Sequence, residues 1–91
     1  MIQKYDFCNE SAELLKALSN PTRLKIVYLL SKQKCNVVTI ETSLGIKQSN
    51  VSRHLFILKS AGIVKGERDK KGIFYEVVNK KVIQLIDFFE K

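Results

Sequence analysis

The sequence predicts a mainly α-helical domain that carries one small β-hairpin near its C-terminal end. Apolar residues recur at helical spacing through four successive segments, and two short strand-like segments then flank the turn "DKKG" before a last helical pattern. The chain has 91 residues, of which 45% are hydrophobic, so it is large enough to form one packed core. We therefore expect a single domain over residues 1–91, with little room for an enclosed active site.

Two helices are expected at the start of the chain. The first is predicted over residues 6–19, where apolar residues follow helical spacing. Asn20 is suited to cap the free N–H groups of a second helix, and Pro21 suits its first helical position. The run from Ile26 to Leu30 is apolar all round, which is typical of a helix at the centre of a domain.

Two further helices follow, separated by a tight connection. A short helix is predicted over residues 37–44 and ends at Gly45, which suits a left-handed C-cap. The next helix lies in the segment "KQSNVSRHLFILKSAG" and ends at Gly62. Its apolar stripe consists of Val51, Leu55 and Leu58. The opposite face carries short hydroxyl side chains and one arginine, namely Ser49, Ser52, Arg53 and Ser60. It carries no acidic residue.

The C-terminal part of the chain predicts a basic hairpin and a fifth helix. The segments "IVKGER" and "IFYEVV" are expected to form the two strands around "DKKG". Asn79 can cap a helix over residues 80–90. That helix has the apolar face Val82, Leu85, Ile86 and Phe89, with Ile83 and Phe88 beside it. A monomer this small cannot readily bury so much apolar surface, so we expect the fifth helix to form a dimer surface with the first.

The third and fourth helices make a helix-turn-helix, and the hairpin makes a wing. A helix that lies in the major groove needs short polar groups near base edges, and it carries no acids because phosphates would repel them. Gln48 and Asn50 suit adenine, and Arg53 suits guanine. The net charge is +7, and +6 of it lies between Lys47 and Lys81, where nine basic residues face three acidic ones. Double-stranded DNA is the partner that this pattern favours.

Residues 12–80 resemble the ArsR/SmtB family of winged-helix repressors, through "LSNPTRLKIVYLL", "QSNVSRHLFILKSAGIV" and a wing that ends in "GIFYEV". The resemblance implies a homodimer that binds an operator near its own promoter and is released by an inducer, often a metal ion. It also implies the DNA contacts, which are Gln48, Ser49, Asn50, Ser52 and Arg53 in the recognition helix and Arg68, Lys70 and Lys71 in the wing. Lys47, directly before that helix, is a further candidate DNA contact. Lys47 departs from the family, where a serine commonly caps this helix; a bound phosphate would offset the charge of the lysine.

The two cysteines, Cys8 and Cys35, are the candidate sensing thiols. The family's zinc ligands on the last helix are absent, and two thiols cannot complete a tetrahedral zinc site. Three interpretations remain open. The thiols meet across a dimer and undergo redox chemistry; they bind a soft metal ion such as Cu(I) or trivalent arsenic; or both are small buried hydrophobic residues, Cys8 in a stripe with Ala12 and Leu15.

Two further residues of the fourth helix have competing interpretations. His54 invites a metal assignment, but a packed, hydrogen-bonded structural histidine fits its position beside the apolar stripe better. Phe56 lies on the polar face, where it packs on a thymine methyl group or, as we favour here, on a neighbouring helix.

The sequence therefore predicts a dimeric transcriptional repressor whose inducer acts through thiols. An enzyme is disfavoured, because there is no Gly-rich phosphate loop and no nucleophile with a placed base. The run "IVYLL" is too short to span a bilayer and the first ten residues lack an apolar secretory segment, so we expect a cytoplasmic protein that does not bind membranes. The alternatives are a sensor of Cu(I) or arsenite, and a winged-helix module that binds protein or RNA, which Phe56 alone favours.

Overall fold

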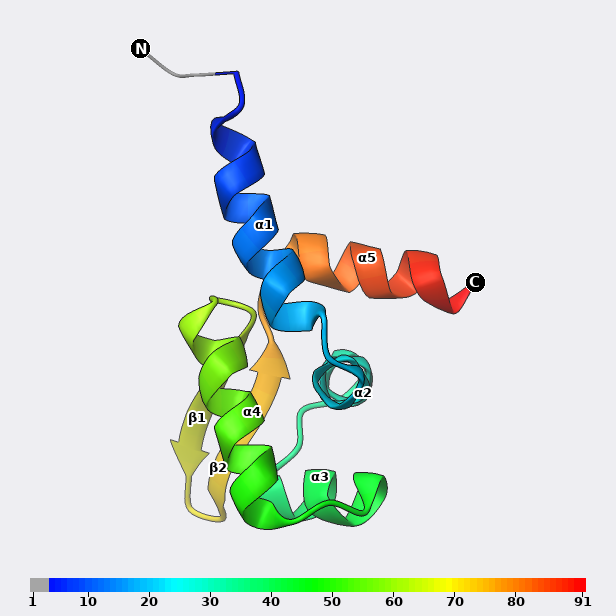
Figure 1. The fold of residues 1–91 in the computed structure, drawn as a ribbon. Coiled ribbons are helices and arrows are strands. Elements are labelled where there is room, and N and C mark those ends of the chain that lie inside the picture. The colour runs from blue at the N-terminus through cyan, green and yellow to red at the C-terminus, as the bar shows by residue number, and fades with distance from the viewer. Residues whose placement is uncertain (1–3) are drawn as a thin grey trace.

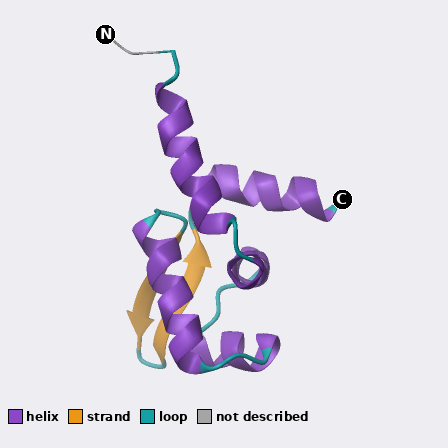
Figure 2. Ribbon diagram, viewed as in Figure 1, coloured by secondary structure: helices purple, strands orange, loops and turns teal. Residues whose placement is uncertain are grey.

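The computed structural model describes residues 4–91 and arranges them as five α-helices and one antiparallel hairpin (Figures 1 and 2). In chain order, the elements are α1 (Asp6–Leu18), α2 (Pro21–Lys32), α3 (Val37–Leu44), α4 (Gln48–Ser60), β1 (Val64–Asp69), β2 (Gly72–Val77) and α5 (Lys80–Glu90). This order confirms the predicted mainly α-helical fold with a small hairpin. None of the helices in the described part of the chain is long and apolar enough to cross a membrane.

Local capping groups set most of the helix boundaries. The side chains of Asn20, Asn36 and Asn79 accept hydrogen bonds from backbone N–H groups in the first turns of α2, α3 and α5. At its C-terminal end, α3 stops at Gly45, whose φ of 66° lies in the left-handed region that favours glycine. The predicted caps at Asn20, Gly45 and Asn79 are therefore confirmed.

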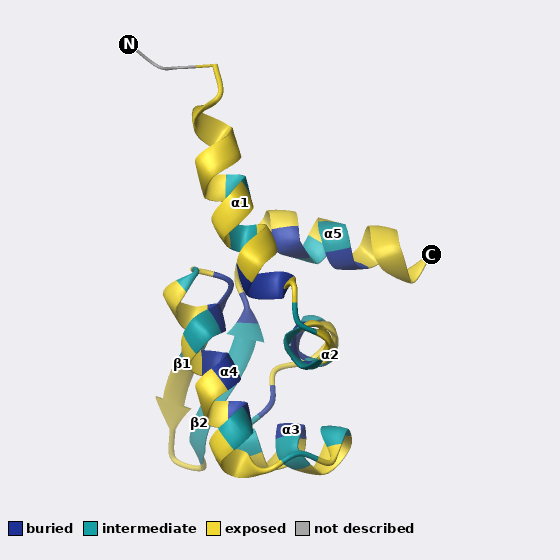
Figure 3. Ribbon diagram, viewed as in Figure 1, coloured by how far each residue is buried: buried dark blue, intermediate teal, exposed yellow. Residues whose placement is uncertain are grey.

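The core lies between α2, α3, α4 and the hairpin. Ile26, Ile40, Leu58 and Ile63 are fully buried there, together with residues from the last turn of α1 and the inner side of α5. Figure 3 shows the same division, with the buried residues on the inward sides of the helices and the first turns of α1 and the end of α5 exposed. The core thus fixes α4 against α2 and α3 and leaves its other side free.

The hairpin is attached to the connection between α2 and α3. Its strands pair from Val64 with Val77 to Asp69 with Gly72. Tyr75 of β2 also exchanges two backbone hydrogen bonds with Cys35, at N···O distances of 3.1 and 2.8 Å. These bonds anchor the wing to the body of the molecule.

The second helix differs in one respect from the sequence prediction. Ile26, Val27 and Leu30 are buried, but Tyr28 is exposed, so the run is not buried all round. The Tyr28 hydroxyl donates a 2.6 Å hydrogen bond to Glu90, and Lys32 forms a 3.0 Å ion pair with the same carboxylate. These contacts hold the last turn of α5 against α2, and they lower the pKa of the Glu90 carboxyl.

The first and last helices carry the large exposed apolar surface. Both extend from the end of the molecule opposite the hairpin turn (Figure 1). Their exposed apolar side chains are Tyr5 and Phe7 at the start of α1, Leu15 further along it, and Phe88 and Phe89 in α5. A surface of this kind is typical of an interface, so a dimer surface on these two helices stays a prediction that the fold accommodates.

Candidate nucleic-acid interface

The recognition helix α4 has one buried side and one polar, exposed side. Val51, Leu55 and Leu58 pack into the core, whereas Gln48, Ser49, Ser52 and Arg53 are exposed. Asn50 lies at the margin and is half-buried. The first turn of α4 and the turn of the hairpin lie at the same end of the molecule (Figure 1). The predicted contact residues of the helix and of the wing are therefore brought to one end.

Arg53 and Asn50 are linked on this surface. Arg53 Nη2 donates a 3.2 Å hydrogen bond to Asn50 Oδ1. The bond orients the guanidinium along the outer face of the helix and leaves its other N–H donors available to guanine or phosphate. Asn50 can still pair with adenine in a bidentate manner, because its amide oxygen has a second lone pair and its NH2 group can donate. Gln48 has no such internal partner in the described structure.

Lys47 occupies the N-cap position of α4 and makes no side-chain cap hydrogen bond. The first turn of the helix also contains no acidic residue. The backbone N–H groups at this end therefore lack a side-chain acceptor, and the positive end of the helix lies beside a cation. An anion such as a DNA phosphate would accept hydrogen bonds from these N–H groups and would neutralise the positive charge at this end of the helix.

We expect Lys47→Ser to stabilise the free protein and to weaken its binding to DNA. A serine cap raises the free energy of unfolding by about 1 kcal/mol, because it satisfies an N–H group of the first turn. The loss of one cation reduces the magnitude of the salt slope of DNA binding by about 1 for each phosphate contact removed. Urea denaturation and salt titrations of binding test the two effects, with Lys25→Ala on α2 as a charge control. Unchanged binding would remove Lys47 from the contact surface.

The wing carries a second group of cations. Arg68, Lys70 and Lys71 are exposed and make no ion pair within the described residues. Asp69 Oδ1 accepts a 2.7 Å hydrogen bond from the N–H of Lys71, which shapes the turn. A surface hollow of about 490 Å³ beside the turn is lined by Lys34, Asp69, Lys70, Lys71 and Phe74. Lys34, which precedes α3, therefore belongs to the basic surface of the wing, although sequence reasoning missed it.

His54 is a packed structural histidine, as the sequence favours. It is 8% exposed, and its Nδ1 atom lies 3.4 Å from Nη1 of Arg23. Arg23 Nε in turn donates a 2.6 Å hydrogen bond to the carbonyl of Ala17. The pair ties α4 to the first two helices. Burial and the charges of Arg23 and Arg53 lower the pKa of His54, so the ring is neutral at pH 7 and accepts from Arg23.

We expect the protein to lose stability as the pH falls below about 6.5, the ordinary pKa of histidine. Because the folded pKa lies below the unfolded one, the unfolded chain binds the proton more readily, and the free energy of unfolding decreases with acidification. Above that pH the stability contribution is fully present. Urea denaturation between about pH 7.5 and 5.5, above the range where carboxylates titrate, measures the change. His54→Gln should flatten the profile, and an equally steep profile would contradict the assignment.

The two thiols lie in different environments. Cys35 is buried, its Sγ atom lies 3.4 Å from the carbonyl of Gln33, and burial raises the pKa of its thiol. Cys8 lies in the first turns of α1 and is exposed, as are Ala12 and Leu15 on the same stripe. The interpretation as a small buried hydrophobic residue therefore holds for Cys35 and is wrong for Cys8 in the protomer. No cluster of three metal-ligating side chains occurs within residues 4–91.

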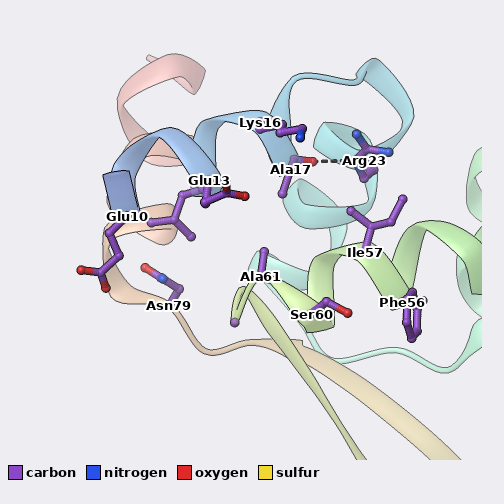
Figure 4. Close-up of a pocket in the computed structure, with 12 residues that line it drawn as sticks. Glu10, Glu13, Lys16, Ala17, Arg23, Phe56, Ile57, Ser60, Ala61 and Asn79 are labelled. Carbon is purple, nitrogen blue, oxygen red and sulfur yellow. Dashed lines mark hydrogen bonds between the residues drawn. The ribbon is translucent and has the colours of Figure 1, made fainter. Parts of the chain in front are cut away.

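A hollow of about 800 Å³ separates α1 from the C-terminal half of α4 (Figure 4). Glu10 and Glu13 of α1 lie on one side of it, and Phe56 and Ile57 lie on the other. Phe56 is exposed. The expectation that it packs on a neighbouring helix is therefore wrong within the protomer.

Comparison with known proteins finds a matching family and relatives that cover most of the chain. A family model described as bacterial regulatory protein, arsR family, matches residues 20–65. A biofilm growth-associated repressor from Xylella fastidiosa is 40% identical over 79 residues, which make up 87% of this chain and 69% of that protein.

Two solved structures share the fold closely. The transcriptional repressor PagR of Bacillus anthracis superposes with a TM-score of 0.86 at 37% identity, over 94% of this chain and 99% of that chain. The homodimeric winged helix-turn-helix DNA-binding domain of Mb0332 from Mycobacterium bovis has a TM-score of 0.86 at 27% identity, over 98% of this chain and 84% of that one. These likenesses confirm the predicted winged helix-turn-helix.

Proposed function

The chain belongs to the ArsR family of bacterial regulatory proteins, and we propose that it represses transcription by placing α4 in the major groove of an operator near its own promoter. It is a DNA-binding transcriptional regulator that acts as a homodimer, and it is not an enzyme. One observation supports the mode of binding above all. The exposed side of α4 is free of acids and, apart from Phe56, polar, while the opposite side is fixed in the core.

The proposed contacts divide into those that read bases and those that hold the backbone. Arg53 and Gln48 reach guanine and adenine edges, because their planar groups match the acceptor and donor patterns of these bases. Ser49, Ser52 and Asn50 have shorter polar side chains, which supply further contacts to bases and phosphates. The cations Lys47, Lys34, Arg68, Lys70 and Lys71 hold phosphates, which fixes the register of the helix without carrying sequence information.

The proposed dimer joins α1 and α5 of two protomers. Both helices extend from the end of the molecule opposite the hairpin turn (Figure 1), so pairing through their exposed apolar side chains leaves both recognition helices free. Two recognition helices related by a two-fold axis bind half-sites about one DNA turn apart, roughly 34 Å. The operator should therefore have imperfect two-fold symmetry.

Thiols are the proposed route by which an inducer releases the repressor. Cys8 is exposed on α1, a proposed dimer helix, and Cys35 is buried beside the backbone bridge to the wing. Modification of Cys8 would disturb the dimer, whereas modification of Cys35 would disturb the attachment of the wing. The alternative, a site for a soft metal ion such as Cu(I) or arsenite, requires the two thiols to come together.

We expect Cys8 to react with a water-soluble disulfide reagent much faster than Cys35 in the native protein. Cys35 reacts slowly, because it is buried and its raised pKa keeps it protonated. The rate is measured on the Cys8→Ser and Cys35→Ser proteins, each of which retains one thiol. Urea should equalise the rates. Equal rates without urea would contradict the burial of Cys35, and slow reaction of both would indicate that the dimer covers Cys8.

The decisive experiment is binding to a labelled fragment of the upstream DNA of the protein's own gene, measured by fluorescence anisotropy in reduced and mildly oxidised protein. Tight specific binding in the reduced state supports the repressor. If oxidation releases the wild-type protein from DNA but does not release Cys35→Ser or Cys8→Ser, the thiol switch is supported and the responsible residue is identified. Tight binding in both states rejects thiol oxidation as the signal. Absence of specific binding in either state would favour a protein- or RNA-binding module instead.

A further inference from the structure

Phe56 lies at the centre of the exposed side of α4. It is 70% exposed, whereas Val51 and Leu58 on the other side of the helix are fully buried. Successive residues of an α-helix are rotated by about 100°, so the direction of Phe56 falls between those of Ser52 and Arg53. The side chain is therefore part of the same face that is proposed to enter the major groove.

No element within residues 4–91 buries this apolar side chain. In Figure 4, Ile57 points towards α1 and α2, whereas Phe56 points away from them. Within the described residues Phe56 has no aromatic partner, and its neighbours on the helix face are serines and Arg53. With a rise of about 1.5 Å per residue, it lies about 4.5 Å along the axis from Arg53, a separation similar to one base-pair step of about 3.4 Å.

We propose that Phe56 contacts the 5-methyl group of a thymine and thereby determines part of the operator sequence. Thymine is the base that presents an apolar group in the major groove, and Phe is suited to it, whereas the neighbouring Arg53 is suited to guanine. The inference rests on the proposed function, because it requires α4 in the major groove. The methyl group read by Phe56 belongs to a base pair adjacent or next but one to the base pair read by Arg53.

The test begins with duplexes that the wild-type homodimer selects from a randomised pool. Each thymine of a selected duplex is then replaced in turn by deoxyuridine, which lacks only the 5-methyl group. We expect one position in each half-site at which the replacement weakens wild-type binding about fourfold, and about 15-fold when both half-sites are changed. Phe56→Ala should bind the thymine and deoxyuridine duplexes equally, and Phe56→Leu should retain part of the difference.

Ser60→Ala is the matched control, since Ser60 lies on the same face one turn further along the helix. It should keep the full sensitivity to deoxyuridine. The inference is overturned if wild type shows no sensitive position, or if Phe56→Ala keeps the sensitivity. It is also overturned if Phe56→Ala dissociates the dimer in sedimentation experiments. If the wild-type protein still selects a specific sequence from the pool, these outcomes overturn the inference about Phe56 and leave the proposed function intact. If the wild-type protein selects no sequence, both the inference and the proposed function are overturned.

Discussion

Arg53→Ala should weaken binding to the operator by a factor of about 5 to 150 for each half-site and should relax the base preference at one position. A bidentate contact from arginine to guanine contributes about 1–3 kcal/mol of discrimination, and each 1.4 kcal/mol corresponds to a factor of ten. Arg53 is exposed on the outer side of α4, and its one side-chain hydrogen-bond partner within residues 4–91 is Asn50. The substitution should therefore leave the fold unchanged. Competition binding with duplexes that vary at each position measures both effects.

Lys70→Ala provides the contrasting control. Lys70 lies at the tip of the wing and has no partner in the described structure, so it is suited to a phosphate contact. Its loss should weaken binding to all sequences alike and reduce the magnitude of the salt slope by about 1 for each contact removed. If both substitutions left operator affinity unchanged, α4 and the wing would not be the contact surface. If Lys70→Ala altered base preference, the division between base and backbone contacts would be wrong.

The elements of the fold could be predicted because their signals are local. Asn20 and Asn79 cap helices through N–H groups two or three residues away, and Gly45 ends α3 through its own backbone conformation. The two sides of α4 follow from the 3.6-residue period alone. The candidate contact residues of α4 could therefore be placed on its exposed face without knowledge of the rest of the molecule.

The remaining features depend on contacts between distant segments. Lys34 joins the wing because Cys35 forms a backbone bridge with Tyr75, and no local pattern announces that pairing. Periodicity shows that Cys8 shares a stripe with apolar residues, but it does not show what covers the stripe. In the protomer only the last turn of α1 is buried, so Cys8 is exposed. Phe56 is exposed for a similar reason, because no other element in the described part of the chain buries it.

Leu58→Ala should lower the free energy of unfolding by about 2–5 kcal/mol, because it leaves a cavity where a fully buried side chain packs. The total free energy of unfolding of a small domain is only about 5–15 kcal/mol. The substitution would therefore loosen the position of α4, and operator binding would fall with it. Phe56→Ala, two residues away on the exposed side, should change stability by less than about 0.5 kcal/mol.

Urea denaturation at a fixed protomer concentration compares the two variants, since the stability of a dimer depends on concentration. A similar loss of stability in both would mean that Phe56 is buried in the assembled protein, in which case it would not be free to reach DNA. A large loss for Leu58→Ala alone would separate the side of α4 that positions the helix from the side that is available to read the operator.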